Sequence, residues 1–156
     1  MSQTLRECLE EARAHGRAVG HFNISNVEAL HGIAHAAEKV GVPVIIGVSE
    51  GEEEFIGLEE AVALVRVMRA RGLNIFLNAD HHASFESCKK CIDAGFDAVI
   101  IDGAKLPFDE NAAQTKRVVE YARASGRDVL VEAELGYIGS GSNIKDTIPE
   151  GAGILT

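Results

Sequence analysis

Five short runs of β-branched and other apolar residues recur along the chain, separated by patterns typical of helices. The runs begin at residues 18, 42, 74, 97 and 128, so successive starts are 24, 32, 23 and 31 residues apart. Strands that are apolar along their whole length and alternate with helices are typical of parallel sheets covered by helices. The sequence therefore predicts an α/β fold with parallel strands over residues 18–24, 42–48, 74–80, 97–102 and 128–135.

Helix start and stop signals fill the intervals between these runs. The clearest helix has Ser25 as its predicted N-cap, Glu28 three residues later, and Gly41 as its stop. A helix before the first strand begins after Thr4 and stops at Gly16. The later helices are also predicted to stop at glycines, namely Gly72, Gly95 and Gly126. The pattern thus predicts helices between the strands.

Two architectures fit this alternation, a doubly wound sheet and a (β/α)8 barrel. A barrel uses about 31 residues per βα unit, so a chain of 156 residues holds about five of its eight units. The pattern alone leaves open whether the sheet is a complete five-stranded one or an incomplete barrel. We expect one domain over 1–156, with a helix at 1–16, strands and helices at 17–135, and a glycine-rich loop at 136–156.

Charge and hydropathy exclude several classes of partner. The chain has 24 acidic and 15 basic residues, and its net charge of −9 argues against nucleic acid and anionic membranes. No apolar run approaches the roughly 18 residues that a membrane span needs, and the first residues lack the layout of a signal peptide. Three cysteines in such a chain indicate a reducing compartment. We therefore expect a cytoplasmic protein.

Acidic and imidazole side chains lie at the predicted carboxyl ends of three successive strands, where ligands of parallel α/β folds collect. The third strand ends in Asp80 and His81, the fourth ends in Asp102, and the fifth contains Glu132 and Glu134. Carboxylates there are costly unless they are paired, hydrogen-bonded or bound to metal. Three such ends on neighbouring strands favour a site for Zn²⁺ or another divalent metal. Of Asp80 and His81, one would ligate the metal and the other would transfer protons.

Other features have simpler interpretations than a site. Cys88 and Cys91 are spaced as C-x-x-C but share the buried face of a predicted helix, so two core thiols are expected. The acidic run at residues 50–54 is expected to be a solvated loop, and the glycine-rich residues 139–143 a flexible lid. Lys105, just after the fourth strand, is the alternative candidate for chemistry, as a Schiff-base lysine.

Several motifs occur in the order found in one enzyme family. They are residues 78–82 (Asn-Ala-Asp-His-His), 93–96 (Asp-Ala-Gly-Phe), 101–103 (Ile-Asp-Gly), 106–111 (Leu-Pro-Phe-Asp-Glu-Asn) and 131–136 (Val-Glu-Ala-Glu-Leu-Gly). Through them the chain resembles the metal-dependent class II fructose-bisphosphate/tagatose-bisphosphate aldolases along essentially its whole length. The resemblance implies a TIM barrel and a lyase of carbohydrate metabolism. Such a lyase reversibly cleaves fructose or tagatose 1,6-bisphosphate into dihydroxyacetone phosphate and glyceraldehyde 3-phosphate.

The resemblance also implies roles for particular residues. Asp80 matches the acid/base carboxylate that handles the proton of the C4 hydroxyl, and His81 matches the first imidazole ligand of the catalytic Zn²⁺. Asp102 and Glu134 match carboxylates associated with a second metal position, divalent or monovalent. Contact with the sugar-phosphate substrate is implied for two positions, Asn23 and Ser49. In this family, Zn²⁺ acts as a Lewis acid on the substrate ketone.

The chain also departs from the family. Members supply two further zinc histidines from later strands, and no histidine follows Asp102 in this sequence. A catalytic zinc takes about three protein ligands, so one imidazole is too few. We therefore expect the amino-terminal part of such an aldolase, an incomplete barrel of about five βα units, with little activity by itself. An open arc exposes apolar strand edges, which predicts a homo-oligomer; the alternative is a non-catalytic half-barrel fragment that self-associates.

Overall fold

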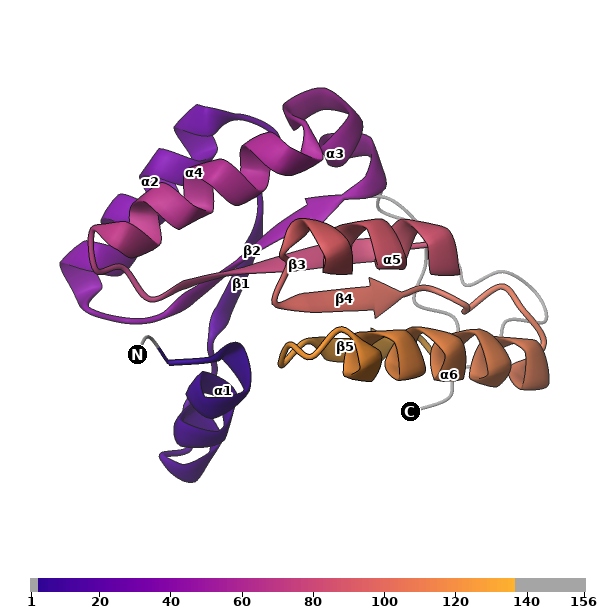
Figure 1. Ribbon diagram of the computed structural model, residues 1–156. Helices are drawn as coiled ribbons and strands as arrows, with labels where there is room; N and C mark the ends of the chain where they lie inside the picture. Colours follow the sequence, from indigo (N-terminus) through magenta and orange to yellow (C-terminus); the bar gives the residue numbers. More distant parts are fainter. Residues whose placement is uncertain (1–2, 137–156) are drawn as a thin grey trace, which may run out of the picture.

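The computed structural model describes residues 3–136 of the chain. Helices and strands alternate along these residues, and all five predicted strands are confirmed (Figure 1). Their bounds are α1 Leu5–Ala14, β1 Gly20–Asn23, α2 Val27–Val40, β2 Val44–Ser49, α3 Glu50–Ile56, α4 Leu58–Ala70, β3 Ile75–His82, α5 Phe85–Ala94, β4 Ala98–Ile101, α6 Phe108–Ala124 and β5 Leu130–Ala133.

The strands form one parallel sheet whose strand order is the order of the chain, β1-β2-β3-β4-β5. A doubly wound sheet reverses its strand order at a switch point, so this order excludes that alternative. Because parallel crossovers are right-handed, the connecting helices lie on one face, where α2, α4, α5 and α6 contact β2, β3, β4 and β5 in turn. The sheet is therefore an arc of a TIM-type barrel.

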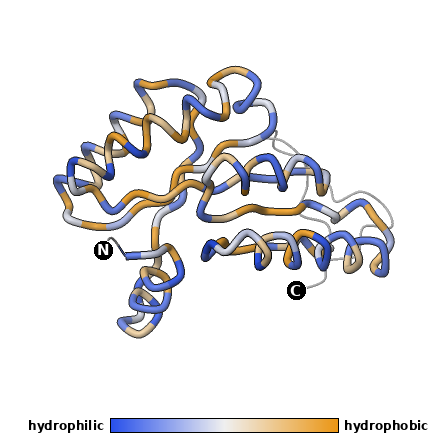
Figure 2. Tube along the Cα trace, in the orientation of Figure 1, coloured by the Kyte–Doolittle hydropathy of each residue, from blue (hydrophilic) through white to orange (hydrophobic). Residues whose placement is uncertain are grey.

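The main hydrophobic core lies between the sheet and these helices. Side chains alternate along β3: Ile75, Leu77 and Ala79 pack into this core, whereas Phe76 packs with Leu5 of α1 on the opposite face. Figure 2 shows the apolar colouring along the central strands and the alternating colours around the helices. Helix α1 thus covers the inner face of the arc near the start of the strands, away from their carboxyl ends.

The helix starts follow local capping. Thr4 caps α1 in a capping box with Glu7, as the sequence predicts. The predicted N-cap of α2 is wrong by one residue: Asn26, not Ser25, caps it by accepting a hydrogen bond from the Ala29 backbone N–H at 2.8 Å. Asn and Ser are about equally good caps, so the local sequence does not distinguish the two positions.

The acidic run at residues 50–54 is helical, so the prediction of a solvated loop is wrong. Ser49 caps α3, and Glu52 completes a capping box by accepting a hydrogen bond from the Ser49 backbone N–H at 2.8 Å. Acidic residues in a first helical turn are also favoured by the helix dipole. The helical periodicity turns one member of the run, Glu53, inward.

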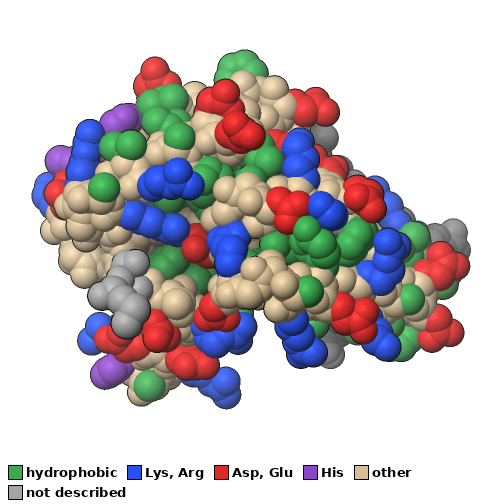
Figure 3. Space-filling view, in the orientation of Figure 1, with side chains coloured by type: hydrophobic (Ala, Val, Ile, Leu, Met, Phe, Trp, Pro, Cys, Tyr) green, Lys and Arg blue, Asp and Glu red, His purple; other side chains and the backbone are tan. Residues whose placement is uncertain are grey.

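The surface of the arc carries mixed charges and two edge strands. Acidic and basic side chains are interspersed over the face drawn in Figure 3. Strands β1 and β5 pair on one side only in the described sheet, and the four residues of β1 are exposed. Within residues 3–136, no helix is long and apolar enough to cross a membrane. Among residues 3–136, the arc therefore has two sheet edges without a neighbouring strand, one of which carries the half-exposed ring of Phe22.

Candidate metal and acid–base site at the strand ends

The parallel sheet brings the predicted site residues to one edge, because parallel strands all end at the same edge. The order of the strands places neighbouring carboxylates side by side. The six residues are Asn23 at the end of β1, Ser49 at the end of β2, Asp80 and His81 among the last three residues of β3, Asp102 after β4 and Glu134 after β5.

A bulge in β3 places Asp80 and His81 on the same side of the strand. Between Ala79 and His82, β3 advances three residues while its partner β4 advances two. His81 has a φ of 52°, in the left-handed region that is uncommon for residues other than glycine. Its Nε2 consequently lies 3.9 Å from Asp80 Oδ1. Adjacent side chains of a regular strand face opposite sides, so the bulge is what allows both to reach the site.

His81 lies between three carboxylates. Its Nδ1 is 3.1 Å from Asp102 Oδ2, to which it donates a hydrogen bond when protonated, and 3.7 Å from Glu134 Oε1. Partial burial opposes the charged imidazolium, but the hydrogen bond to Asp102 and the nearby negative charges outweigh it and raise the pKa of His81. Positive charge is therefore favoured where the carboxylates meet.

Glu134 is the most buried of these carboxylates, with 7% of its surface exposed. Burial raises the pKa of its carboxyl, and the charges of Asp102 and Glu132 add to the rise, against the opposing effect of His81. Its backbone carbonyl accepts a hydrogen bond at 2.7 Å from Asn111 of α6, which fixes the chain where β5 ends. Among residues 3–136, His81 is the neighbour whose charge favours the ionised form of Glu134.

The donor atoms of this cluster suit a divalent cation. Imidazole nitrogen and carboxylate oxygens are ligands that Zn²⁺ and related ions take in proteins, and the clustered negative charge is of the kind a cation offsets. The cluster is open: in the described part of the chain, no three of its ligand atoms all lie within 4.8 Å of one another. The residues present therefore fit part of a metal's ligand set, with His81 as its imidazole.

Asn23 orients the Asp80 carboxylate from two strands away. Its Nδ2 donates a hydrogen bond to Asp80 Oδ2 at 2.7 Å and lies 3.3 Å from Glu52 Oε2. Gly47 of the intervening strand β2 makes room for this contact, since a Cβ there would lie 2.1 Å from Asn23 Oδ1. The acid/base candidate is therefore held by a specific neighbour.

The remaining predicted positions are placed as follows. Ser49 Oγ accepts a hydrogen bond from the Glu52 backbone N–H at 3.4 Å as the cap of α3. Lys105 is exposed in the loop after β4, and residues 139–143 lie outside the described residues. Contact of Asn23 and Ser49 with substrate stays a prediction, as do the roles of the other four residues.

A second polar cluster, on the opposite side of β3, was not anticipated. It contains Glu53, 9% exposed, and His82, Cys88 and Cys91, each 0% exposed. The two predicted core thiols are confirmed, whereas the predicted exposure of Glu53 is wrong. Burial lowers the pKa of His82, raises that of Cys88 to about 12 and also raises that of Cys91. The available sequence signal was a C-x-x-C helix that follows a strand ending in two histidines.

Replacing Glu134 by glutamine is expected to stabilise the chain at neutral pH in buffer that contains a chelator. The pKa of the Glu134 carboxyl is raised in the folded chain, so its ionisation destabilises the fold. This destabilisation is complete at pH values above the folded-state pKa and is absent below the pKa of the unfolded chain. We expect the free energy of unfolding to rise by about 0.5 to 1 kcal/mol at neutral pH, and the gain to fade as the pH falls through the raised pKa. Urea unfolding measures both.

The matched control for this change is Glu10→Gln, because Glu10 is an exposed carboxylate on α1, away from this cluster. This control is expected to leave the free energy of unfolding nearly unchanged. A Glu134→Gln chain that is less stable than the wild type at neutral pH would show that the carboxylate is stabilised where it lies, contrary to its burial beside other carboxylates.

Comparisons with known proteins identify the family of this chain. The family described as fructose-bisphosphate aldolase class-II matches residues 3–156. The fructose-bisphosphate aldolase of Staphylococcus aureus is 45% identical over 141 residues, covering 87% of this chain and 48% of that protein. The fructose-bisphosphate aldolase of Geobacillus stearothermophilus is 43% identical over 152 residues, covering 95% and 52%.

A solved structure shares the fold. The crystal structure of the YdjI aldolase from Escherichia coli K12 has a TM-score of 0.78 and 29% sequence identity, and the match covers 91% of this chain and 54% of that one. The chain thus spans about half the length of the curated relatives it matches. With a family match along nearly all of its residues, the chain belongs to the class II fructose-bisphosphate aldolase family, a family of aldehyde-lyases.

Proposed function

We propose that this chain supplies the amino-terminal part of the active site of a zinc-dependent class II ketose-bisphosphate aldolase. Its substrate would be fructose 1,6-bisphosphate or tagatose 1,6-bisphosphate. Membership of the family supports the reaction class and a sugar-phosphate substrate. The observation that carries the proposal is the arrangement at the strand ends, where Asp80, held by Asn23, lies beside His81.

Cleavage of a ketose bisphosphate requires a base for the C4 hydroxyl proton. In this proposal Asp80 accepts that proton while the C3–C4 bond breaks, and the C4 oxygen becomes the aldehyde oxygen of glyceraldehyde 3-phosphate. The electron pair of the bond stays with the three-carbon ketone fragment, which takes up a proton from solvent at C3 and leaves as dihydroxyacetone phosphate, while Asp80 releases its proton to solvent. Because Asn23 donates to Asp80 Oδ2, the other oxygen, Oδ1, on the His81 side, is the one that takes the proton.

His81 would hold the Zn²⁺, whose charge supplies Lewis-acid stabilisation at the ketone oxygen of the substrate. Asp102 accepts a hydrogen bond from His81 Nδ1, so Nε2, on the Asp80 side, is the nitrogen left for a metal. Asp102 and Glu134 would also bind or support a second cation. The described residues supply one of the roughly three protein ligands that catalytic zinc takes, so the proposal requires ligands from another segment or another copy.

A second candidate function is a non-catalytic half-barrel that self-associates. The two free sheet edges favour it, because unpaired strand edges and an exposed ring such as that of Phe22 promote association. With either function we propose a cytoplasmic homo-oligomer without nucleic-acid or membrane partners. The buried free thiols Cys8, Cys88 and Cys91 are consistent with the reducing compartment this requires.

A graft distinguishes the two functions. Residues 1–136 are joined to the carboxyl-terminal half of the Geobacillus stearothermophilus relative, and cleavage of fructose 1,6-bisphosphate is assayed. We expect the graft to be active, EDTA to abolish the activity and Zn²⁺ to restore it, while the chain alone stays near background. A folded but inactive graft would favour the non-catalytic half-barrel.

Borohydride added with substrate tests the Schiff-base alternative at Lys105. We expect no covalent adduct on the graft by mass spectrometry. An adduct at Lys105, together with full activity in EDTA, would replace the zinc mechanism by an iminium one.

A further inference from the structure

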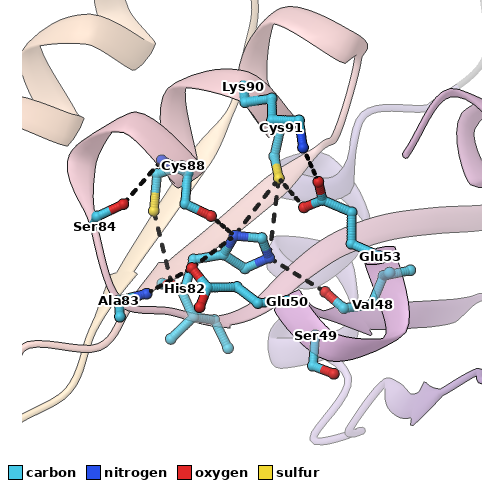
Figure 4. A network of polar contacts seen from close by, with 12 residues as sticks. Val48, Ser49, Glu50, Glu53, His82, Ala83, Ser84, Cys88, Lys90 and Cys91 are labelled. Carbon is cyan, nitrogen blue, oxygen red and sulfur yellow. Dashed lines mark hydrogen bonds and ion pairs between the residues drawn. The ribbon is translucent and has the colours of Figure 1, made fainter. Parts of the chain in front are cut away.

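Three potential metal ligands from three elements meet on the helix-facing side of β3. They are Glu53 of α3, His82 at the end of β3 and Cys91 of α5, and Figure 4 shows the carboxylate and the thiol facing the imidazole ring. One ligand atom of each lies within 4.8 Å of the other two, and this is the one such group among residues 3–136. All three side chains are buried, so the cluster is separate from the open group at the strand ends.

The separations approach those around a tetrahedral ion. Cys91 Sγ lies 3.9 Å from Glu53 Oε2, and 3.8 and 3.9 Å from Nδ1 and Nε2 of His82. With bonds of about 2.3 Å to sulfur and 2.0–2.2 Å to nitrogen or oxygen, neighbouring ligands of zinc lie about 3.3–3.6 Å apart. The distances from Cys91 Sγ are slightly longer than these, and the Glu53 and His82 ligand atoms lie within 4.8 Å of each other, so binding would draw the three side chains closer together.

The imidazole has a partner that fixes its orientation. His82 Nδ1 lies 2.5 Å from Ser87 Oγ, whereas Nε2 lies 3.4 Å from the Val48 carbonyl oxygen and 3.9 Å from Cys91 Sγ. When Nδ1 carries the proton it donates to Ser87, and Nε2 keeps a lone pair. Metal-binding histidines are usually held through one ring nitrogen and ligate through the other, and here a metal on Nε2 would replace its long contact with the Val48 carbonyl.

Two carboxylates and one ammonium group surround the cluster. Lys90 pairs with Oε1 of Glu53, which leaves Oε2 directed toward Cys91 (Figure 4). A second carboxylate, that of Glu50, lies with its Oε1 3.8 Å from His82 Nδ1. Glu50 is positioned to supply a fourth ligand on side-chain rotation, and a water is the other source.

We propose that Glu53, His82 and Cys91 form a second metal site, for Zn²⁺ or a similar borderline divalent ion. Nitrogen, sulfur and oxygen donors together favour such an ion over Mg²⁺ or Ca²⁺, which prefer oxygen alone. On binding, the Cys91 thiol releases its proton to solvent and the thiolate bonds to the metal. The ion would tie α3 and α5 to the end of β3. This site does not depend on the proposed aldolase activity.

Cobalt titration of the full chain, followed by absorption spectroscopy, tests the site. Thiolate bonded to Co²⁺ gives a charge-transfer band in the near ultraviolet, and the strand-end cluster contains no cysteine, so the band reports this site. We expect the band in the wild-type chain and in His81→Ala, and its loss in Cys91→Ala. The matched control is Cys88→Ala: its thiol is equally buried but points at the Ile100 carbonyl, and the band is expected to persist.

Zinc competition against the cobalt signal measures affinity. Ser87→Ala removes the partner of the imidazole and is expected to weaken binding about 10-fold, within the 10- to 100-fold range for such partners. Circular dichroism checks that each variant is folded. Absence of the band from the wild-type chain overturns the proposal even if every variant misfolds. Persistence of the band in folded Cys91→Ala, or its loss in folded Cys88→Ala, also overturns it.

Discussion

Replacing Asp80 by alanine is expected to lower kcat of the active graft about 100- to 10,000-fold, the range for loss of a general acid/base. The carboxylate is directed by Asn23, and its second oxygen lies on the side of His81, so no other described group is oriented equally well to take the C4 proton. Metal content is expected to stay unchanged, because Asp80 is not the imidazole ligand. Steady-state kinetics and elemental analysis of the same preparation measure both.

Asp93→Ala provides the matched control for that change. Asp93 is a carboxylate of α5 whose charge is paired with Lys89 at the surface, so its loss is expected to leave kcat within twofold of the parent, since surface changes of this kind have small effects. Full turnover in Asp80→Ala would show that the base is another group. A loss of zinc in that variant would instead assign Asp80 to the metal.

Replacing His81 by alanine is expected to remove the metal from the strand-end site of the graft, and with it nearly all activity. His81 is the imidazole of that cluster, and carboxylates that remain would not replace a nitrogen ligand in a site that takes about three protein ligands. The expected readings are a fall of one zinc ion per chain by elemental analysis and turnover near background. Addition of excess Zn²⁺ is expected to recover little of the activity.

His35→Ala is the control for this second change, because His35 is an exposed histidine on α2. It is expected to keep both metal and turnover. The zinc measurement on His81→Ala is made in a chain in which Cys91 is also replaced, so that the buried cluster binds no zinc. If this folded double variant still retains zinc, the strand-end metal is held by residues other than His81.

The strands and most helix ends could be predicted because their causes are local. Continuous apolar runs mark buried parallel strands, and glycines such as Gly41, whose φ of 72° is left-handed, mark helix ends. The choice between an open sheet and a barrel arc depends on which strands pair, which periodicity does not encode. Family resemblance supplied it, and the strand order β1 to β5 confirmed it.

The site was predictable in part for the same reason. Parallel strands end at one edge, so carboxylates such as Asp102 and Glu134 were expected to meet there, and the structure places them around His81. The contact between Asn23 and Asp80 was not predictable, because it crosses an intervening strand through the space left by Gly47.

The buried cluster was missed because one helix was missed. A run of glutamates is normally interpreted as a solvated loop. Here Ser49 and Glu52 form a capping box that starts helix α3, and this helix places the Glu53 carboxylate next to Cys91. Equally, alternation along β3 fails at its last residues, where a backbone irregularity keeps His81 on the same side as Asp80 and so leaves His82 on the helix-facing side.

That irregularity has an evolutionary consequence. His81 is the residue by which β3 exceeds β4 between their last two pairings, so the hydrogen-bonded ladder does not require it. Gain or loss of a single codon at this point would add or delete an imidazole while Asp80 and His82 kept their sides of the sheet. The residue proposed to hold the metal therefore lies outside the regular ladder, so its removal is compatible with the pairing of the rest of the strand.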